Sequence, residues 1–233
     1  MAEFTDERKE FSRPRLIVCL HGVNAAPSQF KEVVDQLRNR PNQAESDLFV
    51  PYVLEKGNAP LDALADQTLR VIRAWAERRP RGELVLIGTS NGARIAQAVD
   101  ARLDGALNLR KITVLSIAGA CRGSSTANLA KKVSKFLPVF LFASQNILEE
   151  MPIGSARNQR LEREWQEKLR ERPPVEREYT FIASSNDCTV PDRSSTLMKV
   201  PDGIRAQYGI ACGEGHSSIV AATAQLISEI AIP

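Results

Sequence analysis

The chain has 233 residues, of which 43% are hydrophobic and 25% are charged. This length and composition fit one globular domain with a substantial core, because a second independent domain would leave both halves small. The formal net charge is only +3, and no basic stripe with interleaved aromatic residues occurs, so the sequence offers no argument for a nucleic-acid-binding protein.

Strand-like apolar runs alternate with helical segments along the chain, which is typical of a mostly parallel sheet covered on both faces. The expected strands are 16–20, 48–54, 83–87, 112–117, 179–183 and 206–212, and the expected helices are 28–38, 61–78, 93–103, 155–171 and 216–230. Pro51 interrupts the second strand, so we expect that strand to be short or irregular. The pattern predicts a three-layer α/β domain with about six strands.

No strand pattern occurs between residues 121 and 174. We expect one domain over residues 1–233, with a helical cap or lid inserted at about 121–175, over the strand ends where open α/β sheets bind ligands. Within this insertion, residues 131–142 combine lysines with a large apolar surface, and two interpretations stay open. The segment is a cap helix packed on the core, or it forms an acyl-chain pocket or a peripheral membrane contact. The run Arg157 to Arg172 is expected to be a solvated charged helix, with a partner-binding face as the alternative.

Four cysteines and two histidines are present, and no Cys-x-x-Cys pair occurs. This composition disfavours a structural metal site, and nothing in the sequence calls for an organic cofactor. Cys19 lies inside an apolar run and Cys212 ends another, so we interpret both as reduced, buried thiols.

The first ten residues are too polar for a secretory signal, and the longest apolar run, 136–143, is too short to span a bilayer. We therefore expect a soluble cytoplasmic protein, and export without an N-terminal signal stays open.

The sharpest chemical signal is the stretch Gly88-Thr89-Ser90-Asn91-Gly92, which lies between an expected strand and an expected helix. A Gly-x-Ser-x-Gly turn presents its serine at the tip of a strained bend, where glycines allow close backbone packing. The helix that follows directs amide groups toward developing negative charge. We interpret Ser90 as a nucleophile.

A serine nucleophile needs a base, and a carboxylate to orient that base. His216 follows the last expected strand, and we assign it as the base. Asp187 follows the strand 179–183 and is our preferred acid. Asp192 is the alternative acid, although its position after Pro191 favours capping of the next helix.

The oxyanion of acyl transfer needs two hydrogen-bond donors. His21-Gly22 ends the first expected strand, and we expect the main-chain N–H groups of Val23 and Asn91 to be the donors, with Asn24 as a weaker alternative. We expect His21 to shape this loop by hydrogen bonding and not to act as the base.

Taken together, Leu20-His21-Gly22, Gly88–Gly92, Asp187 with Val190-Pro191, and Gly215-His216 occur in the order found in α/β-hydrolases, which the chain resembles over nearly its whole length. The stretch Arg122-Gly123-Ser124 is similar to part of a Gly-Thr-Pro-His-Arg-Gly-Ser stretch of many lipases and of acyl hydrolases that act on glycolipid anchors. The residues Ala120-Cys121 replace its Pro-His. The resemblance is therefore to compact bacterial lipases and esterases.

The resemblance implies a serine hydrolase that cleaves a carboxylic ester, with a lipid or acyl ester favoured, through an acyl-enzyme. A thioesterase or amidase of the same fold is the alternative within enzymes, and a catalytically silent binding module is the alternative outside them. We expect a small-molecule or lipid ester as the binding partner, and the sequence does not indicate an oligomeric state.

Overall fold

The computed structural model describes residues 14–41, 46–51, 53–103, 105–133, 144–171 and 175–233. Its centre is a six-stranded, fully parallel sheet with the strand order β2-β1-β3-β4-β5-β6. The strands are β1 Arg15–Leu20, β2 Ser46–Phe49, β3 Glu83–Thr89, β4 Lys111–Ile117, β5 Glu176–Ser184 and β6 Arg205–Ala211. This architecture confirms the predicted fold class.

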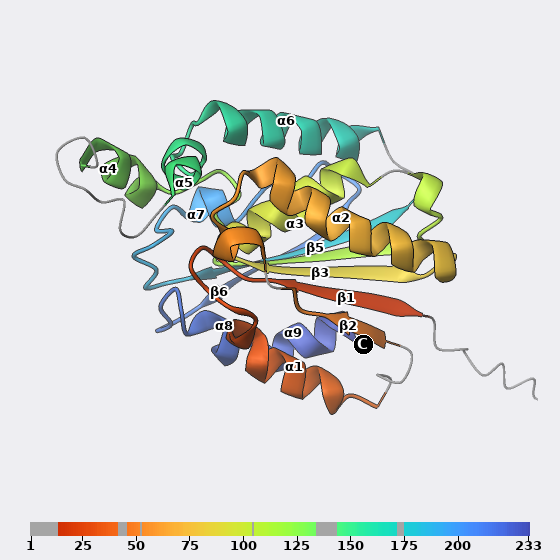
Figure 1. Cartoon of the computed structure of the whole chain (residues 1–233). Coiled ribbons are helices and arrows are strands. Elements are labelled where there is room, and N and C mark those ends of the chain that lie inside the picture. Colours follow the sequence, from red (N-terminus) through yellow and green to blue (C-terminus); the bar gives the residue numbers. More distant parts are fainter. Residues whose placement is uncertain (1–13, 42–45, 52, 104, 134–143, 172–174) are drawn as a thin grey trace, which may run out of the picture.

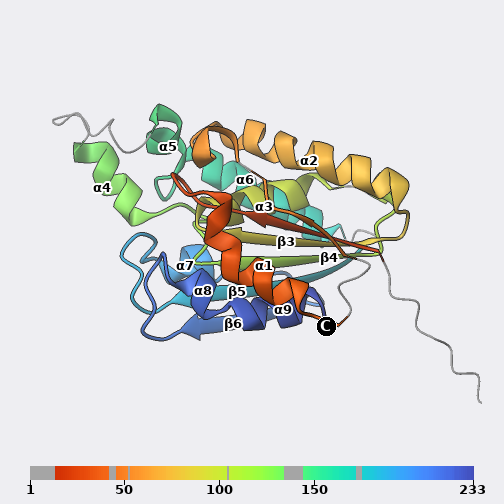
Figure 2. The same cartoon turned by 60° about the horizontal axis from the view of Figure 1, so that its bottom comes forward.

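The helices cover both faces of the sheet, with α2, α3 and α6 on one face and α1, α8 and α9 on the other (Figure 1). Turned by 60°, the molecule shows α1 and α9 side by side on the second face (Figure 2). The helices α4, α5 and α7 lie beyond the carboxyl ends of the strands. The helix bounds are α1 Lys31–Arg38, α2 Leu61–Arg78, α3 Asn91–Arg102, α4 Ser125–Val133, α5 Gln145–Glu150, α6 Ala156–Arg170, α7 Arg193–Thr196, α8 Ile219–Ala222 and α9 Ala224–Ala231. Short 3₁₀ helices are η1 Pro27–Phe30, η3 Leu54–Gly57 and η4 Gly105–Leu107.

The central strands are buried on both faces, which explains why the sequence shows them as continuous apolar runs. In β3, Leu84 and Leu86 belong to the core beneath α2 and α3, whereas Val85 and Ile87 belong to the core on the opposite face. Alternate side chains of a strand point to opposite faces, so burial of both faces requires apolar residues at successive positions. The predicted strands 83–87 and 112–117 are confirmed within two residues at each end.

The second strand and the C-terminal helix are shorter than predicted. β2 spans four residues and ends at Phe49, ahead of Pro51, which confirms the expected short strand. The predicted helix 216–230 is divided into α8 and α9 at Thr223. Cys212 is exposed just beyond β6, an edge strand, so its interpretation as a buried thiol is wrong, whereas Cys19 is buried as expected.

The charged helix α6 is solvated on one side only. Its buried residues, spaced for one helical face, are Asn158, Leu161, Trp165 and Leu169. This face packs against α3, so α6 forms part of the layer that covers the sheet. The expectation of a solvated helix is therefore wrong for this face. Burial of its few large apolar side chains stabilises the packing on α3, although most residues of the helix are charged.

A buried polar cluster joins α3, α6 and β5 near the amino end of the sheet. The carboxylate of Asp100 accepts hydrogen bonds from Trp165 Nε1 at 2.9 Å, from Tyr179 Oη at 2.6 Å and from Arg177 Nε at 2.9 Å. Arg177 is a buried arginine that also donates to the carbonyl oxygens of Val175 and Leu103. This satisfied network fixes the helix layer to the sheet far from the carboxyl ends of the strands.

Part of the expected insertion lies outside the described residues. The apolar run 136–143 and most of the segment 131–142 belong to it, so neither interpretation of that segment is addressed by the described structure. Among the helices that the structure describes, none combines the length and the hydrophobicity that a membrane crossing requires.

Candidate active site

Ser90 occupies a sharp turn between β3 and α3 and has a strained backbone. Its φ and ψ angles are 54° and −123°, a conformation that costs a residue with a side chain on the order of 1–3 kcal/mol. Neighbouring main chain holds this conformation in place. The Ser90 N–H donates to the Ile117 carbonyl at 3.1 Å, and the Ser90 carbonyl accepts from the Ala120 N–H at 3.1 Å. The end of β4 and the loop that follows it therefore bind both main-chain groups of Ser90 and hold the turn in this conformation.

The two glycines of this turn are required by close backbone contacts. A Cβ atom on Gly92 would overlap the carbonyl oxygen of Leu20, and a Cβ atom on Gly88 would overlap the carbonyl oxygen of Gly92. The first turn of α3 thus packs directly on the end of β1. The sequence pattern reflects this steric requirement, as expected for a nucleophile elbow.

His216 and Asp187 are joined by a hydrogen bond, as the sequence predicted for a base and its orienting acid. His216 Nδ1 lies 2.7 Å from Asp187 Oδ2, and the two side chains are 16% and 3% exposed. The other carboxylate oxygen, Oδ1, accepts from the main-chain N–H groups of Thr189 and Val190, each at 2.8 Å. With Nδ1–H bound to the carboxylate, Nε2 is the ring nitrogen left for proton transfer.

The pKa of Asp187 lies below its ordinary value. Burial raises this pKa, but the hydrogen bonds from His216, Val190 and Thr189 together with the charge of the imidazolium outweigh it. The carboxyl group is therefore ionised at neutral pH and can stabilise a protonated His216.

The loops that carry these residues meet at one edge of the sheet, because β3, β5 and β6 are parallel and each residue follows the carboxyl end of its strand. Among the described residues, no hydrogen bond joins the Ser90 hydroxyl to His216. Hydrogen bonds between a nucleophile and its base are often long before substrate binds. The structure thus brings Asp187 and His216 together directly and places Ser90 on the same edge.

Asp192 has a different role from the one expected. It stands at the N-cap position of α7, but its carboxylate accepts from the Ser125 N–H at 2.9 Å, at the start of α4. The expectation that its side chain caps the following helix is therefore wrong. The neighbouring Ser124 hydroxyl donates to the Thr189 carbonyl at 2.6 Å, which ties the Arg122-Gly123-Ser124 stretch to the loop that holds Asp187.

The loop after β1 crosses directly over Ser90. A Cβ atom on Gly22 would lie 2.9 Å from the Cβ of Ser90. The buried His21 orders this loop: its Nε2 accepts from the Val53 N–H at 3.1 Å, and its Nδ1 lies 2.9 Å from the Gly22 carbonyl. Burial lowers the pKa of His21 and the bond to Gly22 opposes this only in part, so the ring is neutral at pH 7.

Of the expected oxyanion donors, Asn24 is disfavoured by its contacts. Its N–H donates to the Lys56 carbonyl at 2.7 Å, and its side-chain oxygen accepts from Asn58 at 2.8 Å. Val23 follows Gly22 in the loop over Ser90, and Asn91 is the first residue of α3. Val23 and Asn91 stay the predicted donors, as the residues that follow Gly22 and Ser90 in the chain.

Arg94, a residue that the sequence analysis does not single out, lies buried behind the Ser90 turn. Its Nη1 donates to Asn91 Oδ1 at 3.0 Å, and its Nη2 lies 3.5 Å from the Glu150 carboxylate of α5. Arg94 and Asp100 are the two charged residues among the first ten residues of α3, all of which are buried. A charged side chain costs free energy to bury and is seldom buried without a partner, so its burial indicates a specific role.

A small apolar cluster lies beside the candidate site. Its buried members are Ala120, Ile147, Met151 and Val190, and the partly buried Val23 and Ala127 pack against it. The cluster combines residues of the loops around Ser90 and Asp187 with residues of α4 and α5. It places buried hydrocarbon side chains next to the polar groups of the candidate site.

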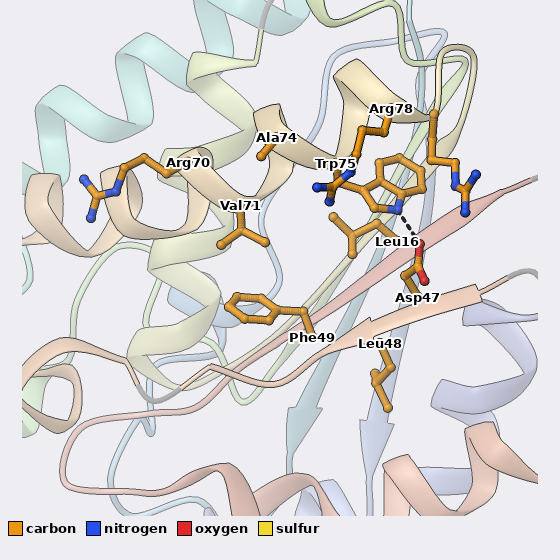
Figure 3. Close-up of a pocket in the computed structure, with 10 residues that line it drawn as sticks. Leu16, Asp47, Leu48, Phe49, Arg70, Val71, Ala74, Trp75 and Arg78 are labelled. Atoms are coloured by element: carbon orange, nitrogen blue, oxygen red, sulfur yellow. Dashed lines mark hydrogen bonds between the residues drawn. The ribbon is translucent and has the colours of Figure 1, made fainter.

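A pocket of about 630 Å³ between β2 and α2 lies elsewhere (Figure 3). Its walls include Leu16, Asp47, Trp75 and Arg78, and Trp75 Nε1 donates to Asp47 Oδ2 at 2.7 Å. Leu16 and Asp47 stand early in their strands and Arg78 ends α2, so this pocket faces the amino edge of the sheet. It is therefore separate from Ser90, Asp187 and His216.

Within the described part of the chain, no group of three or more histidine, cysteine, aspartate or glutamate side chains is arranged to bind a metal ion.

Comparison with known proteins identifies the fold. No protein-family model matches the sequence, and no curated protein is similar to it in sequence. Solved structures do match. The product of the gene lin2722 of Listeria innocua has a TM-score of 0.63 at 15% identity, with 93% of this chain and 92% of that chain covered.

An extracellular α/β-hydrolase from a Paenibacillus species matches with a TM-score of 0.55 at 15% identity, covering 93% of this chain and 97% of that one. A monoacylglycerol lipase from Paleococcus ferrophilus matches with a TM-score of 0.53 at 13% identity, covering 93% and 96%. At such low sequence identity the matches show the fold alone. The chain has the α/β-hydrolase fold, which confirms the predicted resemblance.

Proposed function

We propose that the protein is a serine hydrolase that cleaves a carboxylic ester through an acyl-enzyme, with a lipid or acyl ester as substrate. One observation carries the proposal: an ionised, buried Asp187 binds His216 Nδ1 at 2.7 Å, on the sheet edge where Ser90 stands in a strained turn. A folded protein gains no stability from this strain, and strain of this kind accumulates at functional sites.

In the proposed reaction, Ser90 Oγ attacks the ester carbonyl while His216 Nε2 takes its proton. Asp187 stabilises the resulting imidazolium, and the N–H groups of Val23 and Asn91 bind the oxyanion. The tetrahedral intermediate collapses when His216 gives its proton to the leaving alcohol. Water then attacks the acyl-Ser90 ester with His216 again as base, which releases the acid and restores the serine.

Two features support a lipid or acyl ester as the substrate class. The apolar cluster of Ala120, Ile147, Met151 and Val190 places hydrocarbon side chains next to the candidate site, and α4 and α5 contribute to it as a proposed cap. Several solved structures with this fold are named as lipases, among them the monoacylglycerol lipase of Paleococcus ferrophilus. A thioester or amide would use the same groups, so substrate choice among these classes is a question for assay.

The test is hydrolysis of p-nitrophenyl esters of increasing chain length, in parallel with phospholipid and acyl-thioester substrates and with labelling by a fluorophosphonate probe. The variant Ser90→Ala should lose both hydrolysis and labelling. The matched control is Ser194→Ala, which changes an exposed serine of α7 and should behave as the wild type. Full activity of Ser90→Ala would overturn the proposal. A folded wild type that neither hydrolyses nor labels would instead favour a binding role.

A further inference from the structure

Arg94 is almost completely buried in the first turn of α3, and the acyl-transfer steps proposed above do not use it. Its residue exposure is 1%. Burial lowers the pKa of Arg94 to about 10 although the Glu150 carboxylate opposes this, and the charge of Arg157 lowers the pKa further. A buried cation is costly, and a cation near a helix N-terminus is opposed by the helix dipole. An apolar side chain would fill the same space at lower cost, so stability alone does not account for an arginine.

The contacts of Arg94 lead to both proposed oxyanion donors. Arg94 Nη1 donates to Asn91 Oδ1 at 3.0 Å, and Asn91 Nδ2 donates to the Gly57 carbonyl at 2.9 Å. Gly57 in turn backs onto the loop over Ser90, because a Cβ atom at Gly57 would lie 3.0 Å from the Gly22 carbonyl oxygen and 3.3 Å from Val23 Cα. One chain of contacts therefore runs from Arg94 through Asn91 and Gly57 to Val23.

The same guanidinium group binds α5. Its Nη1 lies 3.1 Å from Met151 Sδ, and its Nη2 donates to the Glu150 carbonyl at 3.4 Å. Glu150 Oε2 also accepts from the Leu61 N–H at 3.2 Å, at the start of α2. Met151 belongs to the apolar cluster beside the candidate site. Arg94 thus connects the Ser90 turn to the helix that contributes to the apolar cluster.

We propose that Arg94 is a positioning residue, which holds the Val23 and Asn91 amides at the separation that the oxyanion requires and couples them to α5. This inference rests on the proposed function. Preorganised donors act on the transition state more than on the bound substrate, so their displacement lowers kcat more than it raises KM. The buried positive charge also favours negative charge developing on that side of the turn, because little solvent screens it.

The test compares Arg94→Met with Arg177→Met. Both arginines are buried, pair with a carboxylate and bind main-chain carbonyls, but Arg177 lies in the Asp100 cluster at the amino end of the sheet. Arg94→Met should lower kcat for a p-nitrophenyl ester by roughly 10- to 100-fold with KM changed less than threefold, the scale expected when catalytic groups are misplaced by about 1 Å. Arg177→Met should lower the melting temperature and keep kcat within about twofold. The Asp100 cluster lies far from Ser90, so its disruption should act on the stability of the fold. Arg94→Lys should recover part of the loss.

A kcat of Arg94→Met within about twofold of the wild type would overturn the proposal, whatever its stability. If Arg94→Met does not fold, Asn91→Ala tests the proposal instead, because it keeps the Asn91 main-chain N–H and removes the side chain that joins Arg94 to Gly57. A wild-type kcat in Asn91→Ala would also overturn the proposal. A double-mutant cycle of Arg94→Met with Asn91→Ala should be non-additive.

A second readout separates this inference from the proposed function. Amide hydrogen exchange in peptides covering residues 20–25 and 53–58 should rise in Arg94→Met and stay unchanged in Arg177→Met. If the wild type hydrolyses none of the esters, the proposed function fails, and this exchange measurement still decides the coupling. Unchanged exchange in those peptides would overturn it.

Discussion

The substitution Asp187→Asn replaces one carboxylate oxygen by an NH₂ group, and the hydrogen bonds around it determine which ring nitrogen of His216 then carries the proton. Asp187 Oδ1 accepts from two main-chain N–H groups, those of Thr189 and Val190, and Oδ2 faces His216 Nδ1. An asparagine must turn its oxygen toward the two N–H donors, which leaves its amide nitrogen facing His216. That nitrogen is a donor, so His216 Nδ1 must accept and the ring proton moves to Nε2.

A ring with its proton on Nε2 cannot take the proton of Ser90. The expected loss in kcat is about 10⁴-fold, as for a triad histidine held in the wrong tautomer. This corresponds to about 5 kcal/mol of transition-state stabilisation, at about 1.4 kcal/mol for each tenfold change in rate. The assay is the hydrolysis of p-nitrophenyl esters, with the melting temperature measured to show that the variant is folded. Asp192→Asn is the control and should keep its activity, because the amide oxygen of an asparagine can still accept from the Ser125 N–H.

The pH dependence of the melting temperature gives a second measurement on Asp187→Asn. The pKa of Asp187 is lower in the folded protein, so its ionisation stabilises the fold above the ordinary aspartate pKa of about 3.9, and this contribution is lost as the pH falls through the folded pKa. The difference in melting temperature between the wild type and Asp187→Asn should therefore stay constant above about pH 5 and shrink as the pH falls below about 4. Retention of more than about a tenth of the wild-type kcat in a folded Asp187→Asn variant would contradict the predicted tautomer change.

Three further predictions follow from backbone geometry and burial. Ser90→Gly should be more stable than Ser90→Ala by about 1 kcal/mol in urea unfolding, because glycine adopts a φ of 54° without strain; equal stabilities would show that the turn is unstrained. Gly92→Ala should fail to give soluble folded protein because its Cβ atom overlaps the Leu20 carbonyl, whereas Gly209→Ala, where a Cβ atom meets open space, should fold normally. Of the four thiols, Cys188 and Cys212 are exposed, and burial raises the pKa of Cys19 to about 12 and that of Cys121 to about 11. Two thiols should therefore react with a disulfide reagent in the native chain and four after denaturation.

The strands and the Asp187–His216 pair could be predicted because each follows from a local rule. Parallel strands buried on both faces must be continuously apolar, and residues that follow them share one sheet edge. With only two histidines in the chain, the one after the last strand was a strong candidate for the base. The glycines around Ser90 form a recognisable pattern because backbone atoms exclude a side chain at both positions, those of β1 at Gly92 and those of α3 at Gly88.

The errors arose where tertiary contacts decide. In α6, Leu161, Trp165 and Leu169 bury one face, although charged residues are more numerous, and only the presence of α3 shows which face is covered. Cys212 follows an apolar run in β6, but that strand is the edge of the sheet, which no local pattern reveals. Asn91 lies three residues from Arg94, but Glu150 and Met151 lie more than fifty residues away, so no local pattern predicts the contacts of Arg94 with α5.

That Ser90 is the nucleophile is tested most directly by mass spectrometry of the chain after reaction with a fluorophosphonate, followed by peptide mapping. We expect one covalent phosphonyl adduct per chain, located on Ser90, with no adduct in Ser90→Ala and greatly slowed labelling in His216→Ala. An unlabelled wild type, or an adduct on any other residue, would contradict it.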